Sequence, residues 1–312
     1  MSLIELPYVA NETLTGLAIP YNPTGLIGDK ILTHTQVDTP EFKYRYYEKG
    51  QFLTTKDTEI GEYGEPIEEE FAYKEKLESI SVYAHMTKLS VRHLHANTSE
   101  ANKEAKRVMF SKNKLKLAGE VRLANLLRDK SIYEGNSLEL TAQNNFSVST
   151  TKVIKTIQGC MDKMYNRANT VVMSSRTLSQ LRTCPQIVTS LKGKEVEDGM
   201  VSMEFLKNEV FGVDNILVGQ GRVNTTKRGQ NVNLSYIWGN DIILAYVDEA
   251  ADIDCGLTFG QRAIYKPYSV QTFSDAKPGA EGVVHYKSVE EYKDFITCPD
   301  CGYIIKNAFT QD

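Results

Sequence analysis

The sequence predicts an α+β fold, and three observations support this prediction. Apolar and polar residues alternate over residues 42–46 and 80–87, as in strands with one buried face. Residues 97–133 have the spacing of one long helix. Helices and strands then alternate from residue 150 to about 255, and a β-rich stretch follows. Together these patterns indicate several packed parts within 312 residues.

The first 40 residues are expected to form an N-terminal arm. Prolines and glycines interrupt their short apolar pieces, so no period of 2 or 3.6 residues persists. Such a segment cannot bury a core by itself. Its apolar residues, from Leu17 to Leu32, favour an arm that lies on another surface over a solvated tail.

Residues 41–92 are predicted to form two strands that enclose a long polar excursion. The strands cover residues 42–46 and 80–86, and the acidic stretch between them runs from Asp57 through Glu70. This stretch is too long for an ordinary hairpin turn and too polar to fold on itself. We therefore expect it to project from the molecule.

The long helix over residues 97–133 is predicted to begin at a capping box formed by Asn97 and Glu100. Its apolar stripe is narrow at first and broadens past Lys116, so the front half should lie on a surface and the back half should enter a core. Its basic residues, from Lys103 to Lys130, could follow phosphates. Because three carboxylates interleave with them (Glu104, Glu120 and Asp129) and no aromatic side chains are expected beside them for stacking, the acidic stretch at 57–70 of another copy is the better partner.

Residues 150–255 are predicted to form a compact α/β unit. A helix is expected over Thr151–Arg167. After it, Ser174 should cap a second helix, Pro185 should begin the next one, and Gly212 should end another. Strands are expected at 170–173, 216–218, 234–238 and 242–247, the last two joined by a turn at Gly239-Asn240-Asp241. After residue 255 we expect strands at 262–273, 282–286 and 302–308, whereas residues 289–296 carry more charge than a strand usually does.

Bulk composition narrows the functional classes. With 41% hydrophobic and 24% charged residues the chain can build a sizeable core. A net charge of -4 and a pI near 5.9 give no whole-chain reason to bind nucleic acid or acidic membranes. The apolar runs are too short to span a bilayer, and the N-terminus lacks the basic start of a signal peptide. Five cysteines with irregular spacing favour a reducing compartment.

The motif Cys298-Pro299-Asp300-Cys301 is the sharpest chemical signal. In thiol oxidoreductases such a pair lies at a helix N-terminus, but here strand patterns flank it and no second pair could complete a zinc ribbon. His85, His93 and His95 could suggest a metal, although no carboxylate or cysteine stands at a matching position. Glu68, Glu69 and Glu70 are typical of a solvated face. We therefore predict no catalytic, cofactor-binding or metal-binding residues.

The order of these parts resembles the major capsid protein of tailed double-stranded DNA phages. Residues 28–32 followed by 42–44 resemble its arm entering the projecting loop, and Leu181–Ile187 is similar to one of its helices. Residues 201–219 resemble its passage from helix to strand in the axial domain. Trp238-Gly239-Asn240 and Gly302–Ala308 resemble its late hairpin and its C-terminal strand. The resemblance covers nearly the whole chain.

The resemblance implies the tailed-phage major capsid protein fold. Its parts are an arm (1–40), an extended β-hairpin loop (41–92), a peripheral domain with a spine helix (93–149, helix 97–133), an axial domain (150–255) and closing peripheral strands (256–312). Some relatives cross-link a loop lysine to an asparagine. Lys56 lies near the start of the loop, but the asparagine and the assisting glutamate have no match here, so this chemistry is not implied.

The implied function is a shell protein, not an enzyme, whose hexamers and pentamers form an icosahedral phage head around double-stranded DNA. Its partners would be copies of itself, a portal, scaffold or decoration proteins, and DNA held without sequence-specific binding, with no membrane and no cofactor. It would assemble in the host cytoplasm and reside in the virion. Because the chain starts directly with the arm, the resemblance implies a separate scaffold protein or none. The alternatives are an encapsulin-like nanocompartment shell that encloses an enzyme, and a thiol oxidoreductase that uses Cys298 and Cys301.

Overall fold

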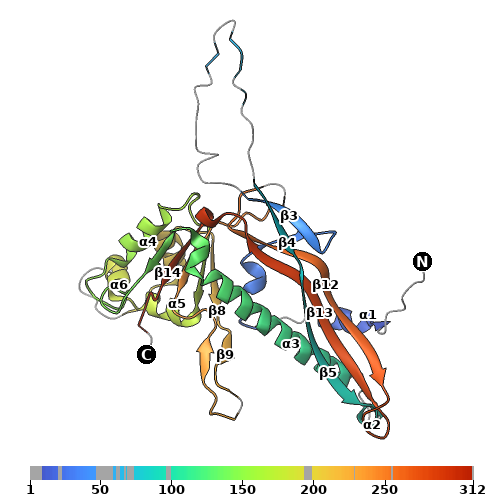
Figure 1. Cartoon of the computed structure of the whole chain (residues 1–312). Coiled ribbons are helices and arrows are strands. Elements are labelled where there is room, and N and C mark those ends of the chain that lie inside the picture. Colours follow the sequence, from blue (N-terminus) through green and yellow to red (C-terminus); the bar gives the residue numbers. More distant parts are fainter. Residues whose placement is uncertain are drawn as a thin grey trace.

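The computed structural model describes residues 9–19, 23–46, 59–60, 64–66, 68, 74–95, 100–192, 199–227, 229–253 and 256–310. A long, narrow sheet and a compact five-stranded sheet organise these residues. Helix α3 (Glu100–Leu127) runs along the long sheet toward the compact one (Figure 1). Within the described ranges, no helix combines the length and apolar character needed to cross a membrane.

The long sheet is built on the antiparallel hairpin of β12 (Gly260–Asp275) and β13 (Val283–Ile296). Strand β5 (Ser81–Ser90) pairs with the other edge of β13. Two short N-terminal strands pair with β12, namely β2 (Thr33–Gln36) in parallel near its start and β1 (Val9–Ala10) antiparallel near its end. The first residues of the chain's described part are therefore fixed along the whole length of this sheet.

The compact sheet holds the main core. Alternate residues of its interior strand β7 (Thr170–Ser174) point to opposite faces, so that Val171 and Met173 join the core under the helices while Val172 packs toward α3. Such fully buried strands contain apolar residues on both faces. In order across the sheet, the strands are β6 (Ser137–Glu139), β14 (Gly302–Lys306), β11 (Ile242–Ala245), β7 and β8 (Asn215–Gly219). The helices that accompany it are α4 (Val153–Met161), α5 (Ser175–Arg182), α6 (Pro185–Lys192), α7 (Met203–Phe205) and the π-helix η3 (Leu206–Phe211).

The predicted local signals of this unit are confirmed. The Ser174 hydroxyl accepts a hydrogen bond from the Thr177 amide at 3.1 Å and caps α5. Pro185 begins α6. Gly212 ends η3 with a φ of 65°, a left-handed conformation that favours glycine.

Short elements complete the described chain. Strands β3 and β4 form an antiparallel pair of their own, as do β9 and β10. Their bounds are β3 (Glu41–Tyr46), β4 (Lys74–Ser79), β9 (Arg222–Asn224) and β10 (Leu234–Tyr236). The remaining helical pieces are α1 (Glu12–Ala18), α2 (Val91–His95), and the 3-10 helices η1 (Gly28–Lys30), η2 (Lys130–Tyr133) and η4 (Pro299–Cys301).

The strands differ from the prediction at three places, two in their pairing and one in their extent. The strand predicted at 80–86 is β5, and it pairs with β13 and not with the strand at 42–46, whose partner is β4. The strands before and after Gly239-Asn240-Asp241 do not form a hairpin, because β10 pairs with β9 and β11 lies in the compact sheet. Residues 289–296 do form a strand, the second half of β13, despite their charge.

The helix limits and the domain limits also differ. Helix α3 ends at Leu127, and the 3-10 turn η2 takes the place of its predicted last turns; the predicted capping box lies outside the described side chains. The helix predicted from Thr151 to Arg167 is the shorter α4. The predicted closing region, 256–312, is divided between the two sheets, because β14 lies in the middle of the compact one.

Candidate assembly site

The N-terminal segment lies along the long sheet and α3 of its own subunit. The prediction of an arm that rests on a surface fits this arrangement, but the segment is not wholly extended because it contains helix α1. The side-chain oxygen of Asn11 accepts a hydrogen bond from the Leu14 amide at 2.9 Å and caps this helix. Leu14 and Ala18 then pack with Val108 of α3 and Val270 of β12 in one apolar cluster.

A buried lysine of α3 holds the end of α1. Lys112 is only 3% exposed, and its Nζ donates hydrogen bonds to the carbonyls of Ala18 at 2.7 Å and Ile19 at 3.0 Å. The last carbonyls of a helix have no partner within the helix, and a cation there also suits the helix dipole. Burial, and then the neighbouring Lys116, lower the pKa of Lys112. Lys112 therefore fixes the N-terminal segment where it leaves α1.

Two turns further along the same face, Glu120 holds the segment that leads into η1. Its Oε1 accepts from the Ile27 amide at 3.1 Å and from the Trp238 indole at 2.7 Å, and its Oε2 accepts from the Gly28 amide at 2.6 Å. The side chain is 3% exposed, and burial raises its pKa while these hydrogen bonds oppose the rise. A Cβ at position 28 would meet Oε2 at 2.6 Å, so glycine lets the carboxylate come this close to the backbone.

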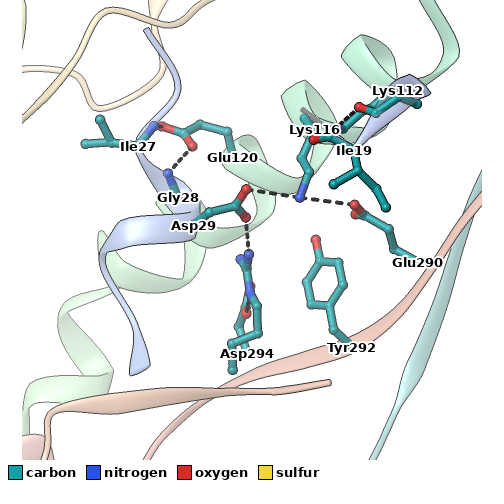
Figure 2. A network of polar contacts seen from close by, with 12 residues as sticks. Ile19, Ile27, Gly28, Asp29, Lys112, Lys116, Glu120, Glu290, Tyr292 and Asp294 are labelled. Carbon is teal, nitrogen blue, oxygen red and sulfur yellow. Dashed lines mark hydrogen bonds and ion pairs between the residues drawn. The ribbon is translucent and has the colours of Figure 1, made fainter. Parts of the chain in front are cut away.

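Between these two contacts, Asp29 forms the centre of an ion network (Figure 2). Its carboxylate lies 3.0 Å from the Lys116 ammonium and 2.6 Å from the Arg262 guanidinium. Lys116 also forms an ion pair with Glu290 at 3.0 Å, and Arg262 donates two hydrogen bonds, of 2.6 and 3.0 Å, to the Asp294 carboxylate. Burial raises the pKa of Asp29, but Lys116 and Arg262 lower it more, so it lies below its ordinary value.

The network joins three elements that are distant in the chain: η1, α3 and the β12–β13 hairpin. The Arg262 side chain is only 6% exposed and the Asp294 side chain only 9%, so removal of Arg262 would leave an uncompensated buried carboxylate, at a cost of about 3–5 kcal/mol. A cavity of about 310 Å³ adjoins it, lined among others by Pro23, Lys30, Gly119 and Tyr292. The carboxylates around this cavity are already bonded, so the arrangement anchors a segment and offers no free acid or base.

Sequence analysis did not single out Lys112 or Arg262, and it treated Glu120 only as one of the carboxylates that interleave with the basic residues of the helix. A signal was present, since Lys112, Lys116 and Glu120 follow one another at four-residue spacing on the side of α3 that also carries buried Val108 and Leu115. Charged residues at such positions indicate buried partners. The partners themselves lie about 90 or more residues away in sequence, as the separations of 93 and 94 for two of these contacts show.

The cysteine pair does not form an exposed reactive site. Cys298 precedes the 3-10 turn η4 and Cys301 ends it, and they are 5% and 0% exposed in the core between the compact sheet and α3. The hydrogen bond from Cys301 lowers the pKa of Cys298, and the same bond, together with burial, raises the pKa of Cys301. The turn is too short to supply the helix N-terminus on which thiol oxidoreductases depend.

The three histidines lie in two different elements. His85 lies in β5, where its Nδ1 is 3.0 Å from the Ser111 hydroxyl of α3. His93 and His95 fall in helix α2. In the part of the chain that the structure describes, no three His, Cys, Asp or Glu side chains gather as metal ligands would.

Most of the predicted projection lies outside the described residues, including Lys56, Glu69 and Glu70. Glu68 is described and exposed.

The sequence of the chain was compared with those of known proteins and protein families. No family model matches the chain. The chain is 28% identical over 303 residues to the major capsid protein of Pseudomonas phage JBD67, which covers 97% of this chain and 98% of that protein.

Solved structures show the same fold. A phage-related protein from Bordetella bronchiseptica matches with a TM-score of 0.74 at 21% identity, covering 96% of this chain and 98% of the other. The capsid protein of cyanophage P-SCSP1u matches with a TM-score of 0.56 at 7% identity, covering 91% and 89%. The encapsulin of Synechococcus elongatus matches with a TM-score of 0.54 at 10% identity, covering 97% and 99%.

The fold is therefore that of the tailed-phage capsid proteins, as the sequence predicted. Within this class, the full-length similarity to a phage protein confirms the predicted resemblance to major capsid proteins. Shell formation in a phage head is the function that these comparisons support.

Proposed function

We propose that this chain is the major capsid protein of a tailed phage and that its copies form hexamers and pentamers of an icosahedral head around double-stranded DNA. The observation that carries the proposal is the sequence match to a phage major capsid protein over 97% of this chain and 98% of that protein. The buried network supports it, because it prepares a rigid subunit in which the N-terminal segment, the spine helix and the long hairpin are fixed together.

The domain map that we propose follows the sequence prediction with two revisions. The arm (1–40), the spine helix and the axial unit (150–255) keep their predicted places. Strand β5 is assigned to the peripheral sheet and not to the projecting loop, because it pairs with β13. Strand β14 is assigned to the axial sheet, because it pairs with β11.

The remaining parts of the proposal follow from the capsid function. The protein acts as a structural element and not as an enzyme, and it needs no cofactor. Its partners are copies of itself, a portal, and scaffold or decoration proteins of its phage, and it encloses DNA without reading sequence. It assembles in the host cytoplasm and resides in the virion. The burial of Cys298 and Cys301 argues against the thiol oxidoreductase alternative, which a disulfide-reduction assay tests directly.

The test is the assembly state of the purified chain, examined by light scattering and negative-stain electron microscopy. We expect rings or shells, and a stable 35.1 kDa monomer at all salt and protein concentrations would contradict the proposal. A variant in which residues 55–70 are shortened to a tight turn is a matched control. It should keep its circular dichroism spectrum and lose assembly, because this stretch contributes few apolar residues to a core.

The cargo separates a phage head from an encapsulin-like shell, whose fold is shared. Particles recovered from a lytic infection should contain nuclease-protected DNA. A single copurifying enzyme inside otherwise empty shells would favour the nanocompartment alternative.

A further inference from the structure

The solvent-facing side of the spine helix α3 carries a row of cations. Lys106, Arg107 and Lys114 are all exposed, and Phe110, which is 50% exposed, lies among them. We name these four residues the exposed stripe. The opposite side of the same helix carries the buried contacts to the N-terminal segment described above. The stripe covers nine residues, from Lys106 to Lys114, whose ends are about 12 Å apart along the helix at roughly 1.5 Å per residue.

The sequence argued against a phosphate-binding role for these basic residues because carboxylates interleave with them. The structure removes this objection, because all three carboxylates lie elsewhere. Glu104 accepts a hydrogen bond at 2.5 Å from the Tyr286 hydroxyl of β13. Glu120 is buried. Asp129 lies beyond the end of α3, where it caps η2 through the Ser131 amide at 3.0 Å.

The cations of the stripe are not neutralised within the subunit. Among the residues that the structure describes, no carboxylate forms an ion pair with Lys106, Arg107 or Lys114. Lys114 instead lies 5.7 Å from the Phe110 ring centroid. In a chain with a net charge of -4, three unneutralised cations within about 12 Å of helix form a local positive field against the overall charge.

We propose that the exposed stripe is a phosphate-binding surface that contacts the backbone of packaged double-stranded DNA without reading its sequence. The inference rests on the proposed function, since it requires DNA inside the shell. Duplex DNA carries about one charge per 1.7 Å of axis, so a duplex segment as long as the stripe carries roughly seven phosphate charges on its two strands. Each cation that neutralises a phosphate releases condensed counterions, whereas an exposed ion pair with a protein carboxylate is worth only about 0.2–1 kcal/mol. The charge pattern therefore favours DNA over an acidic segment of a second copy.

The experiment uses the triple variant Lys106→Gln, Arg107→Gln and Lys114→Gln, in which glutamine preserves helix propensity. A labelled random-sequence duplex is titrated with unassembled protein, and log K is plotted against log salt concentration. Three lost phosphate contacts should reduce the slope by about 2–3, since each contributes about 0.9. Between about 50 and 200 mM salt, the wild-type affinity should therefore fall roughly 40-fold more than the variant affinity.

The matched control removes the same charge from the axial unit, with Lys152→Gln, Lys155→Gln and Lys163→Gln, three exposed lysines. The control should keep the wild-type slope, and all three proteins should form shells. An unchanged slope in the stripe variant, or an equal loss in the control, would overturn the inference while leaving the capsid function intact. Failure of the wild-type chain to form shells would instead contradict the proposed function.

Phe110→Ala separates DNA from a protein partner. An aromatic ring neutralises no phosphate, so this variant should bind DNA with the wild-type slope and assemble normally. If Phe110→Ala and the triple variant both abolish assembly while the DNA slope is unchanged, the stripe is a contact between subunits and the DNA proposal is wrong.

Discussion

Replacement of Glu120 by glutamine tests whether the buried contacts of α3 hold the N-terminal segment. In the native structure the two carboxylate oxygens accept three hydrogen bonds, from the amides of Ile27 and Gly28 and from the indole of Trp238. A glutamine oxygen can keep the two bonds that Oε1 accepts. Its NH2 group then faces the Gly28 amide, and because both groups are donors, that bond is lost.

The size of the effect follows from this geometry. A buried donor left without a partner costs about 1–3 kcal/mol. Removal of the buried negative charge offsets part of the loss, since burial already raises the pKa of Glu120. We expect a net loss of about 2 kcal/mol in the free energy of unfolding, because the hydrogen bond from the Gly28 amide is lost while those from the Ile27 amide and the Trp238 indole are kept.

The assay is unfolding in urea followed by tryptophan fluorescence, because Trp238 is the chain's single tryptophan and its indole bonds directly to Glu120. A loss of about 2 kcal/mol should lower the urea midpoint by roughly 1 M. Glu104→Gln is the matched control, because its amide oxygen can still accept from the Tyr286 hydroxyl, and we expect a loss below about 1 kcal/mol. Equal midpoints for the two variants would refute the role given to Glu120.

Three further predictions concern the same subunit. Lys112→Met should leave the Ala18 carbonyl without its donor, lower stability by about 1–2 kcal/mol, and increase amide exchange in α1; unchanged exchange in α1 would contradict it. Because the pKa of Asp29 lies below its ordinary value of 3.8, its stabilising contribution is complete above that value and is lost as the pH falls through the folded pKa. Asp29→Asn should therefore be less stable at neutral pH and show a shallower loss on acidification below about pH 4, and acid titrations of the two proteins with identical steepness would refute this. The double variant Cys298→Ala, Cys301→Ala should still form particles and should lose no bound zinc, while its smaller side chains lower stability by about 1–2 kcal/mol. Sedimentation tests particle formation and metal analysis tests for zinc, and a loss of either would contradict the prediction.

Local signals in the sequence predicted local structure well. Ser174 caps a helix, Pro185 begins one and Gly212 ends one, because each of these roles depends on only a few neighbouring residues. Strand pairing is a different problem. Alternation over residues 80–86 shows which face of a strand is buried, but it does not identify the neighbouring strand, and so the pairing of β5 with β13 was not foreseen.

Charge was the least reliable guide, because its meaning depends on partners distant in sequence. Residues 289–296 looked too charged for a strand, yet Glu290 and Asp294 lie in β13 and bond to Lys116 and Arg262. Paired in this way, a charged side chain can occupy a buried position that sequence analysis assigns to solvent. The ion partners in β12 and α3 could be found only once the fold had brought these elements together.

Helix α3 shows how face, and not composition, decides what a charged residue does. Lys112 and Lys114 are two residues apart, but Lys112 is buried and bonds to the carbonyl end of α1, while Lys114 is exposed in the stripe. At 100° per residue these positions point in very different directions, so one helix can hold its own N-terminal segment on one side and present cations on the other. The two sets of variants should therefore be separable. Lys112→Met should change stability without changing the salt dependence of DNA binding, and Lys114→Gln should do the reverse, because neither side chain shares a partner with the other.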